Sequence, residues 1–349
     1  MPLQSKRRLA RRTVDLIPLS VLCRLARQNV IVLCYHMIAP VTPRHVVHVA
    51  PVKTPEMFSA DMSWIRQHLH VISYDDLKTS LASGQPLPPQ SVLVTFDDGY
   101  RECLDHAAPV LDRYDVPATF FLTTGLVGNK NLFHRHIASL CIDRLLVASP
   151  RDLNGLDCDG PTGASLWNRR AAWINRVRQS GADDVDQLSH IASLLSVDAS
   201  EFLTQARPFL DWDDARRLHS SGHTIGAHGV RHIRLRDCVD WQEASNEVVS
   251  SCRTVNSQLG GTEAPFAFPF SGDGVDRRDL TTLKSRHPEI GLIFDRRPER
   301  EDPGFIVHRI VADFPGPAAA TGHESNLPNL IRHAARTRLK ARLGTRRSS

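Results

Sequence analysis

The sequence predicts an α/β protein, a distorted (β/α) barrel of seven or eight parallel strands with helices outside them. Short apolar runs rich in β-branched residues alternate with amphipathic helical patterns along most of the chain, the order of elements expected when helices join parallel strands. Chemically active side chains follow several of the apolar runs directly. The alternation breaks once, at 128–208, where helical periodicities succeed one another without a strand. We expect that segment to be a helical insertion beside the barrel.

The first part of the chain predicts four strands and three helices. The strands are expected at 29–35, 71–73, 91–96 and 118–122. A helix should begin at Pro55, because Thr54 before it is a good N-cap and proline suits the first turn. A second helix should span 74–83 and end at Gly84, since glycine readily adopts the left-handed backbone that closes a helix. A third should end near Tyr114.

After the insertion the alternation of helix and strand resumes. Helices are expected from Trp212 and over 241–259, strands at 224–227 and 305–311, and an exposed loop at 296–304. Asp213 lies in the first turn of the first of these helices, where a negative charge complements the helix dipole. Gly260 closes the second helix. The barrel domain is therefore expected to occupy residues 29–318.

Both ends of the chain are basic. The net charge is only +5 over 349 residues, too diffuse to indicate nucleic-acid binding, and its excess lies in an N-terminal helical segment, 1–28, and a C-terminal tail, 319–349. The N-terminal segment makes a poor secretory signal, because Asp15, Pro18 and Arg24 interrupt its apolar part. It could instead form an amphipathic helix, packed on the barrel or in peripheral contact with an anionic membrane.

The composition is that of an ordinary globular protein. Hydrophobic residues make up 41% and charged residues 23% of the chain, and no apolar run reaches the ~18 residues of a transmembrane helix. The seven cysteines show no spacing typical of a metal site or of a disulfide framework. Their pattern favours a reducing compartment, so we expect a cytoplasmic protein, with or without membrane association.

Two adjacent carboxylates and one pair of histidines are the strongest functional signals. Asp97 and Asp98 follow the apolar run 91–96, where carboxylates are costly unless a cation or a reaction needs them. His228 and His232 are four residues apart, a spacing that places both imidazoles on one face of a helical turn. Each signal alone is common in turns or on helix surfaces. Together, at the carboxyl ends of two strands, they predict one site.

One aspartate and two histidines make the N/N/O ligand set of a catalytic zinc site, with a position left open for water or substrate. The second aspartate would then be free to act as a base. The residue chemistry therefore predicts a metal-dependent hydrolase.

These residues resemble the polysaccharide deacetylases, also called the NodB-homology or carbohydrate esterase 4 group. Thr95–Tyr100 is similar to the first motif of that family, T-F-D-D-G. His228–His232 is similar to the second, H-[ST]-x-x-H, with Gly229 where the family usually has a hydroxyl residue. Phe266–Phe270, with Gly272 nearby, is similar to the third. The resemblance covers most of the expected barrel domain.

The resemblance implies a deacetylase-type barrel that removes acetyl groups from the N-acetylated sugars of a polysaccharide or of its precursor. It implies a divalent metal, with Zn²⁺ as the expected ion, held by Asp98, His228 and His232. Asp97 would be the general base that takes a proton from water. The expected partner is an acetylated glycan.

The resemblance also indicates weaker candidates. The backbone N–H of Phe270 would donate to the oxyanion, and Tyr100 is a candidate for substrate contact. An apolar strand ending in His supplies the general acid in the family, and the run that ends at His36 matches it at the start of the chain, as in some poly-N-acetylglucosamine deacetylases that look circularly permuted. His308 is the rival, and Arg309 could replace the family arginine that orients the catalytic aspartate.

The sequence is compatible with three functions. The first is deacetylation of a glycan. The second is hydrolysis of a non-sugar amide or imide by the same residues. The third is a glycan-binding relic without activity, which the intact pairs Asp97–Asp98 and His228–His232 argue against.

Overall fold

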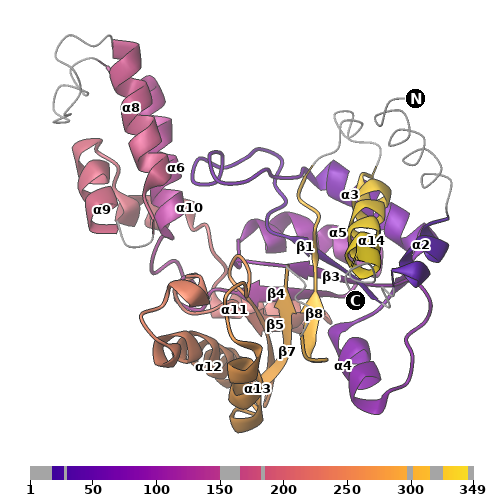
Figure 1. Cartoon of the computed structure of the whole chain (residues 1–349). Coiled ribbons are helices and arrows are strands. Elements are labelled where there is room, and N and C mark those ends of the chain that lie inside the picture. Colours follow the sequence, from indigo (N-terminus) through magenta and orange to yellow (C-terminus); the bar gives the residue numbers. More distant parts are fainter. Residues whose placement is uncertain are drawn as a thin grey trace.

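A sheet of parallel strands nearly closed into a barrel forms the centre of the protein (Figure 1). The computed structural model describes residues 18–26, 30–149, 166–181, 185–296, 302–314 and 325–344. The strands are β1 (Val30–Tyr35), β2 (His70–Val71), β3 (Ser91–Phe96), β4 (Ala118–Leu122), β5 (Thr224–Ala227), β6 (Ala264–Ala267), β7 (Ile290–Asp295), β8 (Ile306–His308) and β9 (Ile310–Val311). They pair in the order β8-β7-β6-β5-β4-β3-β1-β9, with β2 beside β3. The predicted fold class is confirmed.

One stretch of chain brings the two ends of the sheet together. The strand expected at 305–311 is divided at Arg309 into β8, which pairs with β7, and β9, which pairs with β1. Both pairings are parallel. Because a single residue separates β8 from β9, the last strands along the chain bridge the first strand and β7. The side chain of Arg309 is thereby placed at the seam of the barrel.

Helices cover the outside of the strands, and most begin and end where local chemistry predicts. They are α3 (Pro55–His68), α4 (Tyr74–Ser83), the π-helical turn η1 (Cys103–Ala107), α5 (Ala108–Arg113), α11 (Trp212–Ser220), the short η3 (Leu235–Asp237), α12 (Trp241–Leu259) and α13 (Arg277–Arg286). Thr54 caps α3 through a hydrogen bond from the Met57 N–H. Gly84 and Gly260 end their helices in the left-handed conformation, with φ of 72° at both. These glycines act as the sequence predicts.

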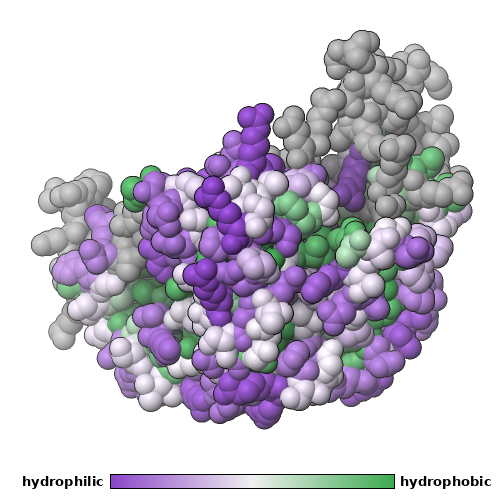
Figure 2. All heavy atoms as spheres, turned by 90° about the horizontal axis from the view of Figure 1, so that it is seen from below, coloured by the Kyte–Doolittle hydropathy of each residue, from purple (hydrophilic) through white to green (hydrophobic). Residues whose placement is uncertain are grey.

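Aromatic side chains pack between the strands and the helices outside them, where Tyr35 also contacts Phe58 of α3. The alternate strand residues form a second apolar cluster on the opposite face of the sheet, which includes Val32, Leu93, Phe121 and Phe294. Every residue of β3 and β4 is buried. Phe96 and Phe120 stack at 4.9 Å between ring centroids, and Tyr35 stacks on Phe96 at 5.5 Å. Seen from below, the outer surface is dominated by hydrophilic residues, with apolar ones scattered among them (Figure 2). The packed interior therefore leaves chemistry to the ends of the strands.

Three of the helices described in the segment expected as an insertion form a separate lobe: α6 (His134–Val147), α8 (Leu166–Gln179) and α9 (Val185–Leu194). A further helix, α10 (Ala199–Ala206), buries Leu203 in the barrel core. Cys141, Leu145, Val177 and Leu188 belong to an apolar cluster of their own, distinct from the barrel core. Figure 1 shows these helices projecting from one end of the barrel. The lobe can therefore shape one side of the barrel mouth.

The two basic ends meet in the described part of the chain. Helix α2 (Leu19–Leu25) packs against α14 (Leu327–Gly344), and Leu22, Leu327 and Ile331 are fully buried. We expected a tail at 319–349; its residues 327–344 instead form a helix docked on the barrel, because its apolar side chains recur at helical spacing. Residues 1–17, on which the proposed membrane contact mainly depends, lie outside the described residues.

No helix in the described ranges is long and apolar enough to cross a membrane. The six cysteines that the structure describes are free thiols, and five of them are buried. The location of the protein and its contact with a membrane stay predictions.

Candidate active site

The predicted site residues gather at the carboxyl-terminal edge of the barrel strands. His36 follows β1, Asp97 and Asp98 follow β3, and His228 follows β5. Because these strands are parallel, residues that come directly after them lie at the same end of the barrel.

Asp98, His228 and His232 form a compact group that could hold a metal ion. One ligand atom from each lies within 4.8 Å of the other two. Asp98 Oδ1 is 3.4 Å from His228 Nε2 and 2.9 Å from His232 Nε2. Atoms that share a tetrahedral zinc ion at ~2.0–2.2 Å are ~3.3–3.6 Å apart, so side-chain placement needs little change to close on one ion.

The donor atoms of this group suit a divalent cation. His228 Nδ1 lies 2.9 Å from the carbonyl oxygen of Ala267, which favours a proton on Nδ1 and leaves the Nε2 lone pair facing Asp98. Asp98 Oδ1 is buried and accepts no hydrogen bond within the described part of the chain. The nearby histidines lower the pKa of Asp98 well below its usual range despite burial, which alone would raise it. A buried, ionised oxygen without a donor is a good metal ligand.

The expected helical turn at 228–232 is wrong. The segment is a loop after β5, and it turns through left-handed backbone at Gly229 (φ 76°) and His232 (φ 56°). Glu247 of α12 holds this loop, because its Oε2 accepts hydrogen bonds from the N–H groups of Val230 at 2.7 Å and Arg231 at 3.0 Å. The histidines therefore converge through loop geometry rather than through helical spacing.

Gly229 fits this loop for two reasons. Its positive φ is readily adopted by glycine, and a Cβ at this position would lie 3.2 Å from Glu247 Oε2. A hydroxyl residue here, as in the family motif, would have to share space with that carboxylate. Glu247 thus supports the histidine loop through the backbone.

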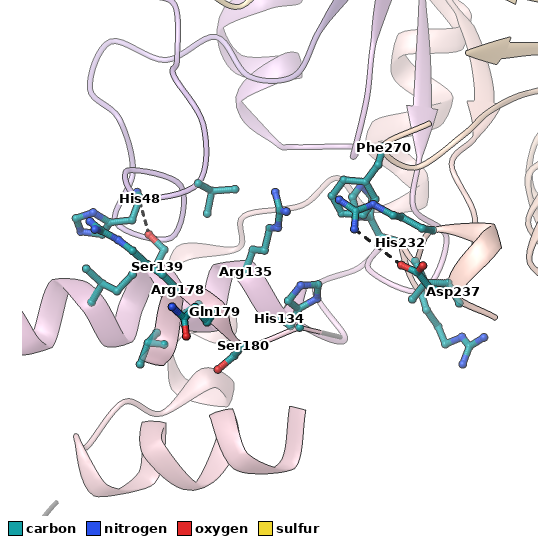
Figure 3. A pocket seen from close by; sticks show the side chains of 18 of the residues that line it. His48, His134, Arg135, Ser139, Arg178, Gln179, Ser180, His232, Asp237 and Phe270 are labelled. Carbon is teal, nitrogen blue, oxygen red and sulfur yellow. Dashed lines mark hydrogen bonds and ion pairs between the residues drawn. The ribbon is translucent and has the colours of Figure 1, made fainter. Parts of the chain in front are cut away.

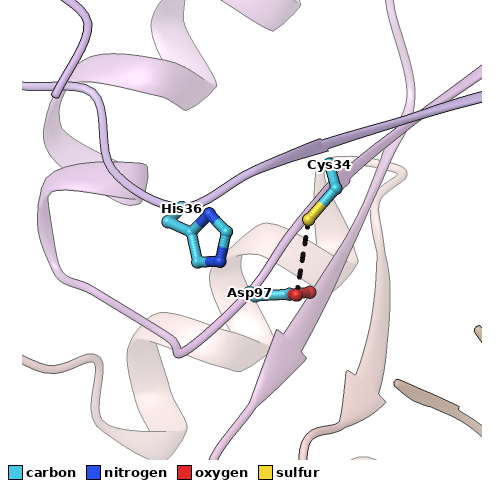
Figure 4. Close-up of side chains that lie close together, drawn as sticks. All are labelled: Cys34, His36 and Asp97. Carbon is cyan, nitrogen blue, oxygen red and sulfur yellow. Dashed lines mark hydrogen bonds between the residues drawn. The ribbon is translucent and has the colours of Figure 1, made fainter. Parts of the chain in front are cut away.

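Asp97 lies outside the metal group and is bound by an arginine. Arg309 donates to both carboxylate oxygens, at 2.5 Å to Oδ1 and 2.7 Å to Oδ2. Burial by itself raises the pKa of Asp97, but Arg309, His228 and His36 outweigh it and lower the pKa to about 2. The Cys34 thiol lies 3.4 Å from Asp97 Oδ2 (Figure 4). Asp97 is therefore an oriented carboxylate, ionised at neutral pH.

His36 is paired with an aspartate that the sequence did not single out. Its Nδ1 lies 2.6 Å from Asp313 Oδ2, and its backbone N–H donates to Asp313 Oδ1 at 2.9 Å. Burial lowers the pKa of His36, but Asp313, with Asp98 and Asp97 behind it, raises the pKa to about 9. A ring nitrogen of His36 lies within 4.8 Å of ligand-type atoms of Asp97 and Cys34. His36 is therefore protonated at neutral pH next to the oriented carboxylate.

The rival histidine lies elsewhere. His308 Nε2 is 3.1 Å from Asp302 Oδ2, and the next residue, Arg309, directs its side chain to Asp97. Successive side chains of a strand point to opposite faces, so His308 is directed away from the carboxylate that Arg309 binds. Tyr100 is 3% exposed, and its hydroxyl lies 2.8 Å from His136 Nε2. Burial and then the neighbouring Asp98 carboxylate raise the pKa of Tyr100 well above its usual range, so this side chain lies beside the metal group.

Phe270 lies beside the metal group in strained backbone. Its φ is 61°, and its N–H makes no hydrogen bond within the described residues. Its ring is 4.9 Å from the ring of His232. Asp98 and His232 also have positive φ, at 74° and 56°. Such backbone costs ~1–3 kcal/mol per non-glycine residue and clusters at functional sites.

Comparison with known proteins gives one family. Residues 84–285 match the family model described as polysaccharide deacetylase. A poly-β-1,6-N-acetyl-D-glucosamine N-deacetylase of Staphylococcus epidermidis is 30% identical over 87 residues, which are 25% of this chain and 30% of that protein. Its counterpart from Staphylococcus aureus is 32% identical over 78 residues, 22% of this chain and 26% of that protein. The aligned parts thus span less than a third of these curated relatives.

Two solved structures show the same fold at low identity. A deacetylase of Streptococcus pyogenes, PplD, solved in complex with acetate, has a TM-score of 0.52 and 14% identity, over 81% of this chain and 91% of its own. IcaB from Ammonifex degensii has a TM-score of 0.52 and 16% identity, over 87% of this chain and 97% of its own. These likenesses concern the arrangement of strands and helices.

Proposed function

Since the chain belongs to the polysaccharide deacetylase family, we propose that it is a metal-dependent hydrolase that removes acetyl groups from N-acetylated sugars of a polysaccharide. One observation carries the proposal. An ionised carboxylate, Asp97, and a protonated imidazole, His36, lie side by side next to a group of one aspartate and two histidines. Amide hydrolysis needs a base for water, an acid for the amine and a Lewis acid for the carbonyl.

Each residue has a defined task in this proposal. Asp97, fixed by Arg309, accepts the proton of the attacking water. His36, held by Asp313, delivers a proton to the departing nitrogen. The N–H of Phe270, which makes no hydrogen bond within the described residues, donates to the oxyanion. Asp98, His228 and His232 would hold a divalent metal such as Zn²⁺, which supplies Lewis acidity when bound.

The glycan is favoured over other amides by the relatives. Both Staphylococcus proteins are named for the deacetylation of poly-β-1,6-N-acetyl-D-glucosamine. The same residues could cleave a non-sugar amide or imide, because the chemistry at the carbonyl is shared. The paired orientation of Asp97 by Arg309 and of His36 by Asp313 argues against an inactive glycan-binding relic.

Acetate release tests the proposal directly. We expect the protein to release acetate from β-1,6-linked or β-1,4-linked N-acetylglucosamine oligomers, to lose this activity after treatment with a chelator, and to regain it with Zn²⁺. Zn²⁺ should also raise the melting temperature, because an ion that binds only the folded state stabilises it. Metal-stimulated cleavage of simple amides without any glycan turnover would transfer the assignment to the second function. A protein without turnover of either class would be the relic.

The pH profile should depend on Asp313. The acid must be protonated to act, and the pKa of His36 is about 9, so kcat/KM should fall as the pH rises through about 9. The Asp313→Asn change removes the carboxylate that raises the pKa of His36, while burial still lowers that pKa. The alkaline decrease of kcat/KM should therefore begin about 1–3 pH units lower. Asp143→Asn, which removes an exposed carboxylate paired with Arg44, is the matched control. An unchanged alkaline limb in Asp313→Asn would contradict the acid role.

A further inference from the structure

A cavity of about 540 Å³ lies between the helical lobe and the loop that carries His232. Figure 3 shows Arg135 and His134 of α6 between Phe270 and His232 on one side and Arg178 and Gln179 on the other. The cavity is large enough for one or two sugars, and one of the proposed metal ligands lines it. A group bound here would therefore lie next to the reacting acetyl group.

Basic side chains converge on this cavity. The guanidinium groups of Arg135 and Arg234 lie 4.9 and 4.5 Å from the centroid of the same ring, that of Phe270. No carboxylate among the described residues forms an ion pair with Arg135, and the one nearest to Arg234, Asp237, is 3.9 Å away. Like charges held this close repel each other unless an anion lies between or beside them.

The other carboxylate of the cavity is already engaged. Glu243 accepts from the Arg231 guanidinium at 2.7 Å and from the Val239 N–H at 2.7 Å. Its charge is therefore not available to Arg135. The four arginines that line the cavity, Arg135, Arg178, Arg231 and Arg234, outnumber its two carboxylates.

The first turn of α6 adds to this positive potential. The helix begins with His134, Arg135 and His136, carries no acidic residue in its first turn and has no side-chain cap at Phe133. Cations at the positive end of a helix dipole are unfavourable, whereas an anion there is stabilised. Burial, and then the charges of Arg135 and other neighbours, lower the pKa of His134 to about 4.

A buried donor of the site also lacks a partner. His232 is 6% exposed, and its Nδ1 makes no hydrogen bond within the described residues. With Nε2 directed to Asp98, the neutral ring can carry its proton on Nδ1. A buried polar group without a protein partner is costly, which favours a ligand that accepts a hydrogen bond from it.

We propose that this cavity binds an anionic group of the substrate, a carboxylate or a phosphate, carried by the sugar that is deacetylated or by its neighbour. The inference rests on the proposed deacetylase activity and specifies its substrate class as an acidic glycan or a glycan carried on phosphate. Arg135 and Arg234 are the residues that select for this charge.

Acetate release from three substrates tests the inference. They are chitotetraose, which is neutral; a tetrasaccharide of alternating N-acetylglucosamine and glucuronate, which carries carboxylates; and N-acetylglucosamine 1-phosphate. For at least one of the anionic substrates, kcat/KM should exceed that of chitotetraose by about tenfold or more. The anionic substrate with the higher kcat/KM shows whether the bound group is a carboxylate or a phosphate. Equal or better turnover of chitotetraose by the unaltered protein would overturn the inference.

Variants assign the preference to named residues. Arg135→Gln and Arg234→Gln should each lower kcat/KM for the preferred anionic substrate about 10- to 100-fold and change that for chitotetraose by less than about threefold. Arg135→Lys should retain much of the preference because it keeps the charge. Arg216→Gln is the matched control, since this exposed arginine contacts Asp213 and Gln258 on α11 and α12. Equal losses on anionic and neutral substrates in Arg135→Gln would mean a structural role and would overturn the inference.

Binding separates failure of the inference from failure of the proposed activity. Calorimetry on the Asp97→Asn protein, which should not turn over, compares the acidic tetrasaccharide, N-acetylglucosamine 1-phosphate and chitotetraose, with and without Arg135→Gln. A preference for an anionic ligand that Arg135→Gln abolishes supports the inference even if no glycan is deacetylated. Binding without such a preference, or unaffected by Arg135→Gln, refutes it even if deacetylation is observed.

Discussion

The Asp97→Asn variant should keep its metal and lose nearly all turnover. Asp97 belongs to no metal-ligating group with Asp98, and its two oxygens are bound by Arg309. The substitution removes the proposed base and leaves the three ligands in place. General-base catalysis contributes typically ~10²–10⁴-fold, so kcat should fall by about that factor, with zinc content unchanged by elemental analysis.

Asp98→Asn is the control with the opposite signature. This change weakens a proposed ligand, so metal content and the stabilisation by Zn²⁺ should both fall. Asp97→Asn also leaves the buried Arg309 without its countercharge, so its melting temperature must be measured before its kcat is interpreted. Near-native kcat in a folded Asp97→Asn protein, with activity lost in Asp98→Asn, would show that the two roles are reversed.

Local chemistry predicted the strands and caps because each depends on a few neighbouring residues. The strands at 91–96 and 118–122 have the expected bounds, and Gly84 and Gly260 end their helices as expected. The docked helix α14 was missed, because basic residues dominate its composition and only its buried apolar face shows that it packs. Whether this segment docks as a helix depends on its tertiary packing, which composition does not reveal.

The site was predictable where it consists of strand-end motifs and not where it depends on distant contacts. The positions of Asp97, Asp98 and His228 follow from the parallel strands that precede them. Asp313 is 277 residues from His36, and nothing local marks it except that it follows the last strand. Its position after β9, which pairs with β1, was the available signal.

Glu247 was missed for a different reason. It lies in the middle of α12, where a glutamate is usually solvent-exposed, yet it is 4% exposed and bound to the histidine loop. The sequence signal was Gly229 itself. A glycine where the family has a hydroxyl residue indicates that something else must support the loop.

The His36→Ala variant should lose amide hydrolysis far more than the hydrolysis of activated esters. His36 is protonated at neutral pH because Asp313 raises its pKa to about 9. It lies beside Asp97, and from this position an acid can reach the departing nitrogen. An amine leaves poorly without a proton, whereas a nitrophenolate leaves without one. General-acid loss should therefore lower kcat/KM for an N-acetylglucosamine oligomer by about 10²–10⁴-fold and that for 4-nitrophenyl acetate only slightly.

The comparison of the two substrates within one variant separates chemistry from structure. A change that merely loosened the site would slow both reactions to a similar extent, because both need Asp97 and the metal group. His308→Ala is the matched control, since His308 contacts Asp302 and is directed away from Asp97. Its ratio of amide to ester hydrolysis should equal that of the unaltered protein. Equal losses on both substrates in His36→Ala, or a selective loss of amide hydrolysis in His308→Ala, would remove His36 from the role of general acid.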